Sequence, residues 1–398
     1  MGIGPFFIWK GFAMKIHPPF VIYRDQRFYS TFPGVAAIGG REIFVAFRRC
    51  PSYHGWPGVD EKYCCHYNPV SQLMLTRSRD GGKSWSEPEL LYSPPEGASQ
   101  DASLFFDGKY LFVSSFIWEH VPPHLVRMLD ESGSGRYLSR FDVNKEAVAL
   151  PGGVYVLRSD DLGKSFHGPY RPAPLPGTPE LFPGHPRRMH NRGNITRGGD
   201  GSLLWVGDRF ENEFTPQMSA DVMLYRSVDD GVSWQFVTVA IDSRGDPEYL
   251  YEEPFLTVTP AGKYVLLVRS QRRKPDGSLT RADLVTAEST DNGRTWTPPV
   301  RHDIHAEPSA ACRLPDGRTL IVYGYRKEPC GVRGRIVSPE FEALDAAEEF
   351  IIRDDSPFPD TGYPGITLLD EHHAMVVYYI EDPAVPTARG IEGNIIEF

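Results

Sequence analysis

Four copies of a short motif in this sequence combine an aspartate with glycine and hydroxyl residues, the residue types of metal-binding loops, acid–base sites and tight turns. The motif reads SRDGGKSW at residues 78–85, and its copies begin at residues 159, 227 and 289. A calcium loop of the EF-hand type needs further oxygen ligands and a glutamate at its twelfth position, which these copies lack. The motif therefore predicts a structural turn, in which the aspartate and hydroxyl side chains bind backbone N–H groups and a glycine adopts a positive φ.

The stretches around each motif copy indicate β-strands. Each copy follows a run in which apolar residues alternate with other residues, as in SQLMLTRS at residues 71–78. Period-two alternation that ends at turn residues is typical of a strand that enters a tight turn. The aromatic residue that closes each motif is expected to pack between neighbouring sheets. These aromatic residues are Trp85, Phe166, Trp234 and Trp296.

A second repeat of hairpins predicts the architecture. Six pairs of apolar runs, each joined by a turn-forming segment, recur along the chain; they lie at residues 35–48, 102–116, 195–209, 255–270, 309–326 and 366–379. Six units of about four strands predict an all-β, six-bladed β-propeller that spans residues 1–398 as one domain. The last unit is one strand short, and segment 17–25 is expected to complete it and close the ring. Two insertions, at 119–150 and 171–190, are expected to overhang one rim.

Composition and charge exclude several classes of function. The chain has 398 residues, 40% of them apolar, and a formal net charge of −10 at pH 7. The negative charge argues against nucleic acid and against an acidic membrane surface as partners. The five cysteines show no metal-ligand spacing, so no metal or other cofactor is expected. The N-terminus lacks a convincing signal peptide and no apolar stretch is long enough to span a membrane, so a cytoplasmic location is expected.

In a propeller, the segments that lead into the innermost strands line one mouth of the central channel. The six hairpins therefore nominate six short segments for chemistry. These segments include Asp101, His190, Arg192, Glu252, Glu253, Glu307, Asp360 and Tyr363. Polar residues at strand starts are often merely solvated, so their positions alone assign no role.

The four copies of the Asp motif, called Asp boxes below, and the C-terminal half of the chain together resemble the sialidase superfamily, the neuraminidases of the Asp-box propeller type. Glu253 is followed by a proline, Arg269 comes 16 residues later, Arg335 a further 66 and Tyr363 a further 28. This order of Glu, Arg, Arg and Tyr resembles the catalytic order of that family. The resemblance covers nearly the whole chain, but boxes alone also occur in propellers that are not enzymes.

The resemblance implies a retaining exo-glycosidase that hydrolyses a terminal acidic sugar, either sialic acid or a related keto-acid sugar, from a glycoconjugate. Arg269 and Arg335 would hold the sugar carboxylate, since guanidinium groups bind carboxylates bidentately. Tyr363 would attack the anomeric carbon and Glu253 would take its proton. A separate carboxylic acid must protonate the leaving oxygen.

Several positions depart from the family pattern. The arginine of the N-terminal Arg-Ile-Pro pattern is replaced by Thr31, and Arg48 or Arg49 is the candidate substitute. The acid is either Asp60 or Asp101.

Other roles and functions also stay open. His190 and Arg192 are candidates for substrate contact, with a role in the rim loop as the alternative. A glycosidase or lyase acting on a uronic acid, and a non-catalytic propeller that binds a glycan or a protein, are the alternative functions.

Overall fold

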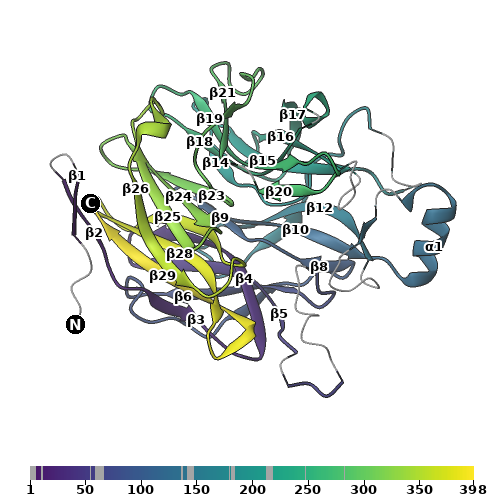
Figure 1. Cartoon of the computed structure of the whole chain (residues 1–398), viewed down its shortest axis with the longest axis horizontal. Coiled ribbons are helices and arrows are strands. Elements are labelled where there is room, and N and C mark those ends of the chain that lie inside the picture. The colour runs from purple at the N-terminus through teal and green to yellow at the C-terminus, as the bar shows by residue number, and fades with distance from the viewer. Residues whose placement is uncertain are drawn as a thin grey trace.

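The computed structural model describes the chain except for residues 1–5, 10–11, 54, 59–66, 136–137, 141–147, 179, 181–183, 212–217, 247 and 282. Within the described part the fold is all-β, and its strands form five hydrogen-bonded sheets (Figure 1). One α-helix is described, α1 (Pro123–Glu131), which lies at the edge of the molecule and buries none of its residues. No described helix has the length and apolar character needed to cross a membrane.

The largest sheet contains two groups of strands and brings the two ends of the chain together. The groups are hydrogen-bonded to each other at one pair, Tyr29 and Arg389. The first group is β4 (Phe28–Ile38), β5 (Glu42–Pro51), β6 (Gln72–Ser78) and β7 (Glu89–Tyr92). The second group is β27 (Gly362–Leu368), β28 (His373–Asp382), β29 (Val385–Glu397) and β3 (Phe20–Tyr23), with the hairpin of β1 (Phe6–Trp9) and β2 (Phe12–Ile16) attached to β29.

In the second group, the N-terminal strand β3 pairs antiparallel with the last strand β29. The first and last parts of the chain therefore share one sheet.

The other four sheets follow one another along the chain. The first of them contains β8 (Gly97–Ser99), β9 (Ser103–Phe106), β10 (Leu111–His120), β11 (Ser139–Arg140), β12 (Val148–Ser159) and β13 (His167–Tyr170). The next contains β14 (Ile195–Arg197), β15 (Leu203–Glu211), β16 (Ser219–Ser227) and β17 (Gln235–Ile241), and is followed by the 3₁₀ turn η3 (Ser243–Gly245). The third contains β18 (Tyr249–Val258), β19 (Tyr264–Arg273), β20 (Leu279–Arg281), β21 (Val285–Ser289) and β22 (Val300–Arg301). The fourth contains β23 (Ser309–Arg313), β24 (Thr319–Tyr325), β25 (Cys330–Val337) and β26 (Glu349–Ser356), with the turn η4 (Leu344–Ala346) before β26.

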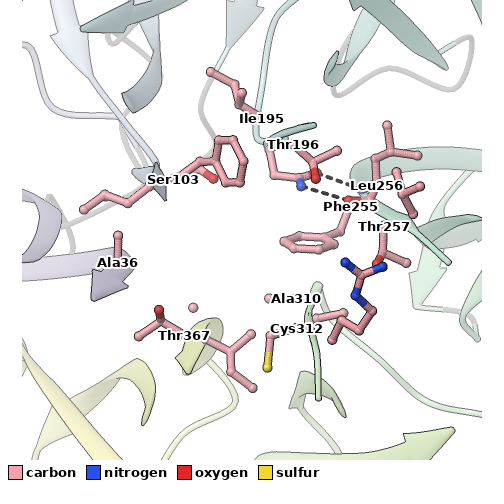
Figure 2. A pocket seen from close by; sticks show the side chains of 18 of the residues that line it. Ala36, Ser103, Ile195, Thr196, Phe255, Leu256, Thr257, Ala310, Cys312 and Thr367 are labelled. Carbon is pink, nitrogen blue, oxygen red and sulfur yellow. Dashed lines mark hydrogen bonds between the residues drawn. The ribbon is translucent and has the colours of Figure 1, made fainter. Parts of the chain in front are cut away.

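The first strand of each predicted hairpin lines one shared cavity. Residues of β4, β9, β14, β18, β23 and β27 surround a volume of about 800 Å³. Figure 2 shows side chains from these strands around the cavity, among them Ser103, Phe255 and Thr367. Large buried apolar side chains instead pack between neighbouring sheets: Trp205 on β15 and Trp234 after β16 cluster with Phe112 and Phe116 on β10 of the preceding sheet. The apolar core therefore lies between sheets, and the cavity is lined by polar as well as apolar side chains.

The repeated Asp motif is a structural turn, as the sequence predicted. Ser84 N donates to Asp80 Oδ1 at 2.9 Å, and Gly82 N donates to Ser78 Oγ at 2.8 Å. The same pair of bonds recurs around Asp161, Asp229 and Asp291. The glycine has φ between 77° and 89° in all four copies, a backbone conformation that glycine adopts at little cost.

Candidate active site

Three of the cavity-lining strands carry the same local distortion. Strands β4, β18 and β27 each contain a β-bulge, where Phe32, Glu253 and Tyr363 have φ of 56°, 51° and 48°. A positive φ is costly for residues other than glycine, and such residues concentrate at functional sites. Each of the three precedes a proline, which has no N–H to give to the strand ladder. A bulge of this kind re-aims a side chain out of the regular strand alternation.

Tyr363 and Glu253 meet through a short hydrogen bond, although they lie 110 residues apart. The Tyr363 hydroxyl donates to Glu253 Oε1 at 2.5 Å. Arg269 Nη1 donates to Glu253 Oε2 at 2.8 Å and to the Tyr363 oxygen at 3.2 Å. Only 3% of Tyr363 and 6% of Glu253 is exposed. Three of the residues that the sequence nominated therefore form one buried, hydrogen-bonded group.

Burial and neighbouring charges set the protonation states of this group. Burial raises the pKa of Tyr363 well above its usual value, and the negative charge of Glu253 raises it further. Burial also acts to raise the pKa of Glu253, but the Arg269 guanidinium, the Tyr363 hydrogen bond and the Arg192 charge together hold that pKa below its usual value. At neutral pH, Glu253 is therefore an ionised acceptor and Tyr363 a neutral donor whose proton already points at a base.

Two further guanidinium groups lie against the Tyr363 ring. The Cζ atoms of Arg326 and Arg192 lie 5.2 and 5.3 Å from the ring centroid, and Arg192 Nη2 donates to the carbonyl of Pro364 at 3.0 Å. Arg192 was a candidate for substrate contact, whereas Arg326 was not singled out. Its signal in the sequence was its place at the end of its hairpin, which is also the place of Arg269 in the preceding one.

A buried carboxylate, Glu307, lies within 4 Å of three arginines. Its Oε2 lies 3.7 Å from Arg269 Nη2, 3.1 Å from Arg281 Nε and 3.8 Å from Arg326 Nη1, and its Oε1 lies 3.2 Å from His305 Nε2. Burial acts to raise the pKa of Glu307, but the neighbouring His305 and the three arginines bring it down to about 2. Glu307 therefore stays ionised and orients Arg269 and Arg326.

Asp101 is the candidate acid that the structure describes. Its Oδ2 lies 3.8 Å from Arg192 Nη1. Burial raises the pKa of Asp101 to about 7, against the lowering effect of the Arg192 charge. The carboxyl group therefore still carries a proton near neutral pH, as a general acid must. The rival candidate, Asp60, lies outside the described residues.

Arg48 lies close to the site but not against Tyr363. It faces Thr31 across the hairpin of β4 and β5 and is fully buried. Its Nε donates to Ser71 Oγ at 3.0 Å, and its Cζ lies 5.8 Å from the centroid of Phe32. The Phe32 ring in turn packs on Tyr363 at a centroid distance of 4.8 Å. One aromatic ring therefore stands between Arg48 and the Tyr363 ring.

His190 is enclosed by aromatic rings. Its ring lies 4.7 Å from that of Phe116 and 4.3 Å from that of Trp118, centroid to centroid, and 1% of the residue is exposed. Burial lowers the pKa of His190 to about 3, so the imidazole is neutral at neutral pH. His190 therefore offers a substrate no positive charge.

The expectation that Arg335 converges with Arg269 near Tyr363 is wrong. Arg335 Nε donates to the Tyr323 hydroxyl at 3.0 Å, Nη2 to Glu349 at 3.4 Å and Nη1 to the carbonyl of Ala347. Arg335 stands on β25 opposite Glu349 on β26, the two strands farthest from the cavity in that sheet. The guanidinium ties outer strands together. Arg326, on the cavity side of the same sheet, occupies the place expected of Arg335.

A second group of hydroxyls and charges adjoins Tyr363 through Arg326. Tyr29 and Tyr379 each donate to the Asp360 carboxylate at 2.6 Å. Arg326 Nη2 donates to the Tyr379 hydroxyl at 3.1 Å, and Arg389 Nη2 lies 3.4 Å from Asp360. The two guanidinium groups balance the charge of Asp360, so this group supports the position of Arg326.

The arrangement supplies the parts of covalent catalysis at an acidic substrate. A tyrosine hydroxyl is hydrogen-bonded to an ionised base, arginines surround it, and a carboxyl group that keeps its proton to about pH 7 lies beside one of them. Among the described residues, no group of three or more His, Cys, Asp or Glu side chains is arranged to hold a metal ion.

Comparison with known proteins gives a family match. The model of the BNR repeat-like domain matches residues 137–339, which is half of the chain. No curated protein sequence matches the chain. A crystal structure of a protein of unknown function from Dyadobacter fermentans is 31% identical, with a TM-score of 0.81 over 97% of this chain and 99% of that one.

Sialidase structures share the fold at low sequence identity. The NanB sialidase of Streptococcus pneumoniae is 13% identical, with a TM-score of 0.60 over 96% of this chain and 70% of that one. The intramolecular trans-sialidase of Ruminococcus gnavus, solved with oseltamivir carboxylate, is also 13% identical, with a TM-score of 0.58 over 96% of this chain and 97% of that one. The all-β fold therefore matches that of the sialidase propellers.

Proposed function

Because this chain belongs to the BNR repeat-like domain family, within the sialidase superfamily, we propose that it is a retaining exo-glycosidase of sialidase type that hydrolyses a terminal acidic sugar. The hydrogen bond of 2.5 Å between the Tyr363 hydroxyl and Glu253 is the observation that carries the proposal. A buried tyrosine that faces an ionised carboxylate among arginines has little structural purpose, because ionising and desolvating these groups is costly. The same arrangement suits a nucleophile that must approach a negatively charged sugar.

The reaction would proceed in two steps. In the first, the Tyr363 oxygen bonds to the anomeric carbon as the glycosidic bond breaks, Glu253 accepts the Tyr363 proton, and Asp101 donates its proton to the leaving oxygen. In the second, water attacks the anomeric carbon, the ionised Asp101 accepts the proton of the water, and Tyr363 leaves and recovers its proton from Glu253. Asp60 is the alternative acid for both steps.

The sugar carboxylate would bind to Arg269 and Arg326. Both guanidinium groups lie within 4 Å of Glu307, which orients them, and both contact Tyr363. Arg192, whose Cζ also lies close to the Tyr363 ring, is a further candidate contact. Because Thr31 and Phe32 stand where a third arginine is expected and Arg48 is buried behind Phe32, a uronic acid is a substrate alternative to sialic acid.

The proposed scaffold is a single six-bladed propeller. Its support is the six hairpin strands around one cavity, together with the antiparallel pairing of β3 with β29. In this arrangement β3 completes the last blade and closes the ring. A non-catalytic propeller that binds a glycan or a protein is the second candidate function, and the near-complete burial of Tyr363 is the observation that favours it.

A panel of aryl glycosides tests the proposal. The purified protein is incubated with aryl glycosides of sialic acid, deaminated sialic acid and a uronic acid, and release of the aryl alcohol is followed by absorbance. We expect release from one of the three, with the sugar product formed first in the configuration of the substrate. Binding of the glycosides without any release would instead support the non-catalytic candidate.

A further inference from the structure

The backbone of Glu253 needs a hydrogen-bond partner that its own sheet does not provide. The pairing of β18 with β19 runs from Glu252 opposite Arg269 to Phe255 opposite Leu267, so Glu253 and Pro254 fall in the bulge. The Glu253 N–H is therefore outside the ladder, in a residue that is 6% exposed. A buried N–H without a partner costs about 1–3 kcal/mol.

Asp208, on β15 of the preceding sheet, supplies that partner. Its Oδ2 accepts the Glu253 N–H at 2.7 Å and the Asn191 Nδ2 at 3.1 Å. Its backbone exchanges two hydrogen bonds with His190, of 2.8 and 3.2 Å. None of Asp208 is exposed, and its Oδ1 has no hydrogen-bond partner among the described residues. The carboxyl group is thus held firmly and turned toward the next sheet.

We propose that Asp208 is a positioning residue for the reaction, which holds the left-handed backbone of Glu253 and through it the hydrogen bond from Tyr363 to Glu253. The inference rests on the proposed function for its kinetic consequence, but not for its structural one. Asp208 touches neither substrate nor the reacting atoms; it acts through the N–H of the base. A shift of Glu253 by an ångström would break a bond of 2.5 Å to the nucleophile.

The charge of Asp208 is not what the position requires. Burial raises the pKa of Asp208 well above its usual value, opposed by the Glu253 N–H and assisted by the negative charges of Glu252 and Glu253. Burial therefore favours the neutral carboxyl group, and the Glu253 N–H needs from this position only an acceptor oxygen, which lies at 2.7 Å. An asparagine, which is neutral and has an acceptor oxygen in the same place, should preserve the hydrogen bond to the Glu253 N–H, whereas an alanine should lose it.

A matched control is the contact of Asn194 with Leu256, which lies three residues after Glu253 on β18. Asn194 Oδ1 accepts the N–H of Leu256 at 2.7 Å, and its Nδ2 donates to the Leu256 carbonyl at 3.0 Å. Like Asp208, Asn194 is buried, and its side chain is hydrogen-bonded to the backbone of a strand in the neighbouring sheet. Asn194→Ala therefore removes an equivalent contact between the same two sheets without touching Glu253.

The kinetic arm compares Asp208→Ala, Asp208→Asn and Asn194→Ala on the best aryl glycoside. We expect Asp208→Ala to lower kcat by about 10- to 100-fold with KM within about threefold of wild type. Asp208→Asn should recover kcat to within about threefold of wild type, and Asn194→Ala should stay within that range at a comparable loss in Tm. An equal loss of kcat in Asn194→Ala, or a failure of Asp208→Asn to recover kcat, would overturn the positioning role.

The structural test does not require the protein to be an active enzyme. Amide hydrogen exchange, measured by NMR on ¹⁵N-labelled protein, should be at least about tenfold faster for Glu253 in Asp208→Ala and unchanged for Leu256. Asn194→Ala should show the reverse, with Leu256 faster and Glu253 unchanged. Equal protection of the Glu253 amide in Asp208→Ala and wild type would reject the inference. If the wild type cleaves no glycoside, the proposed function fails and the exchange rates still decide the role of Asp208.

Discussion

Replacing Tyr363 with phenylalanine separates a catalytic tyrosine from a packing one. The substitution removes the hydroxyl that donates to Glu253 at 2.5 Å and accepts from Arg269 at 3.2 Å. It keeps the ring, which packs on Phe32 and lies close to the guanidinium groups of Arg192 and Arg326. If Tyr363 is the nucleophile, kcat should fall by at least about 10³-fold, because the oxygen that forms the bond to the sugar is lost.

The cost in stability should be small. A hydrogen bond to a charged group contributes about 1.5–3 kcal/mol, and an unfolding entropy of about 2.1 cal/mol/K per residue gives about 0.8 kcal/mol/K for 398 residues. The expected drop in Tm is therefore about 2–4 °C. Differential scanning calorimetry measures Tm, and release of the aryl alcohol measures kcat.

Tyr323→Phe is the matched control for this experiment. The buried hydroxyl of Tyr323 donates to Glu349 Oε2, also at 2.5 Å, among the outer strands that hold Arg335. Its loss should lower Tm by a similar amount and leave kcat within about twofold. A Tyr363→Phe variant that keeps more than a tenth of the wild-type kcat, or one that fails to fold while Tyr323→Phe folds, would refute the role of Tyr363 as nucleophile.

Three further perturbations test the arginine that would bind the sugar carboxylate, the proposed general acid and the structural turn. Arg326→Gln should lower kcat/KM by about 10- to 100-fold through KM, whereas Arg335→Gln should change KM by less than about twofold; equal effects in steady-state kinetics would contradict the assignment of Arg326. The rate should require protonated Asp101, whose pKa is raised to about 7, so kcat/KM should fall about tenfold per pH unit above pH 7. That alkaline limb should disappear, at a lower rate, in Asp101→Asn, and its persistence there would favour Asp60 as the acid. Asp80→Ala removes the bonds to Ser84 in the first box and should lower Tm with kcat within about twofold; a loss of activity in fully folded protein would show that the box has a role beyond the turn.

Local patterns in the sequence predicted the strands and turns of the all-β fold well, because the forces that form them are local. The motif at residues 78–85 predicted a turn closed by Asp80, and the structure has that turn. Alternation of apolar residues predicted the hairpin strands that line the cavity. Helix α1 had no such signal, because none of its nine residues is fully buried and its N-terminus carries no capping hydrogen bond from a side chain.

The site was predictable only in part, because it depends on register and on bulges. Glu253, Arg269 and Tyr363 were recognisable from their order, and they meet in the structure. Arg335 has a suitable spacing, but pairing with Glu349 places it on an outer strand, since register and not distance along the chain decides what a residue faces. Asp208 had no signal, because its partner is an N–H exposed by a bulge in another sheet.

A covalent intermediate would test the central proposal most directly. The wild-type protein is incubated with a difluorinated form of whichever acidic sugar it releases from the aryl glycosides, so that the second step is slowed. The protein is then digested and analysed by mass spectrometry. We expect the mass of one fluorinated sugar on the peptide that contains Tyr363, and none on that peptide in Tyr363→Phe. Turnover of the glycoside with the sugar attached to another residue, or with no attachment to Tyr363, would contradict the mechanism.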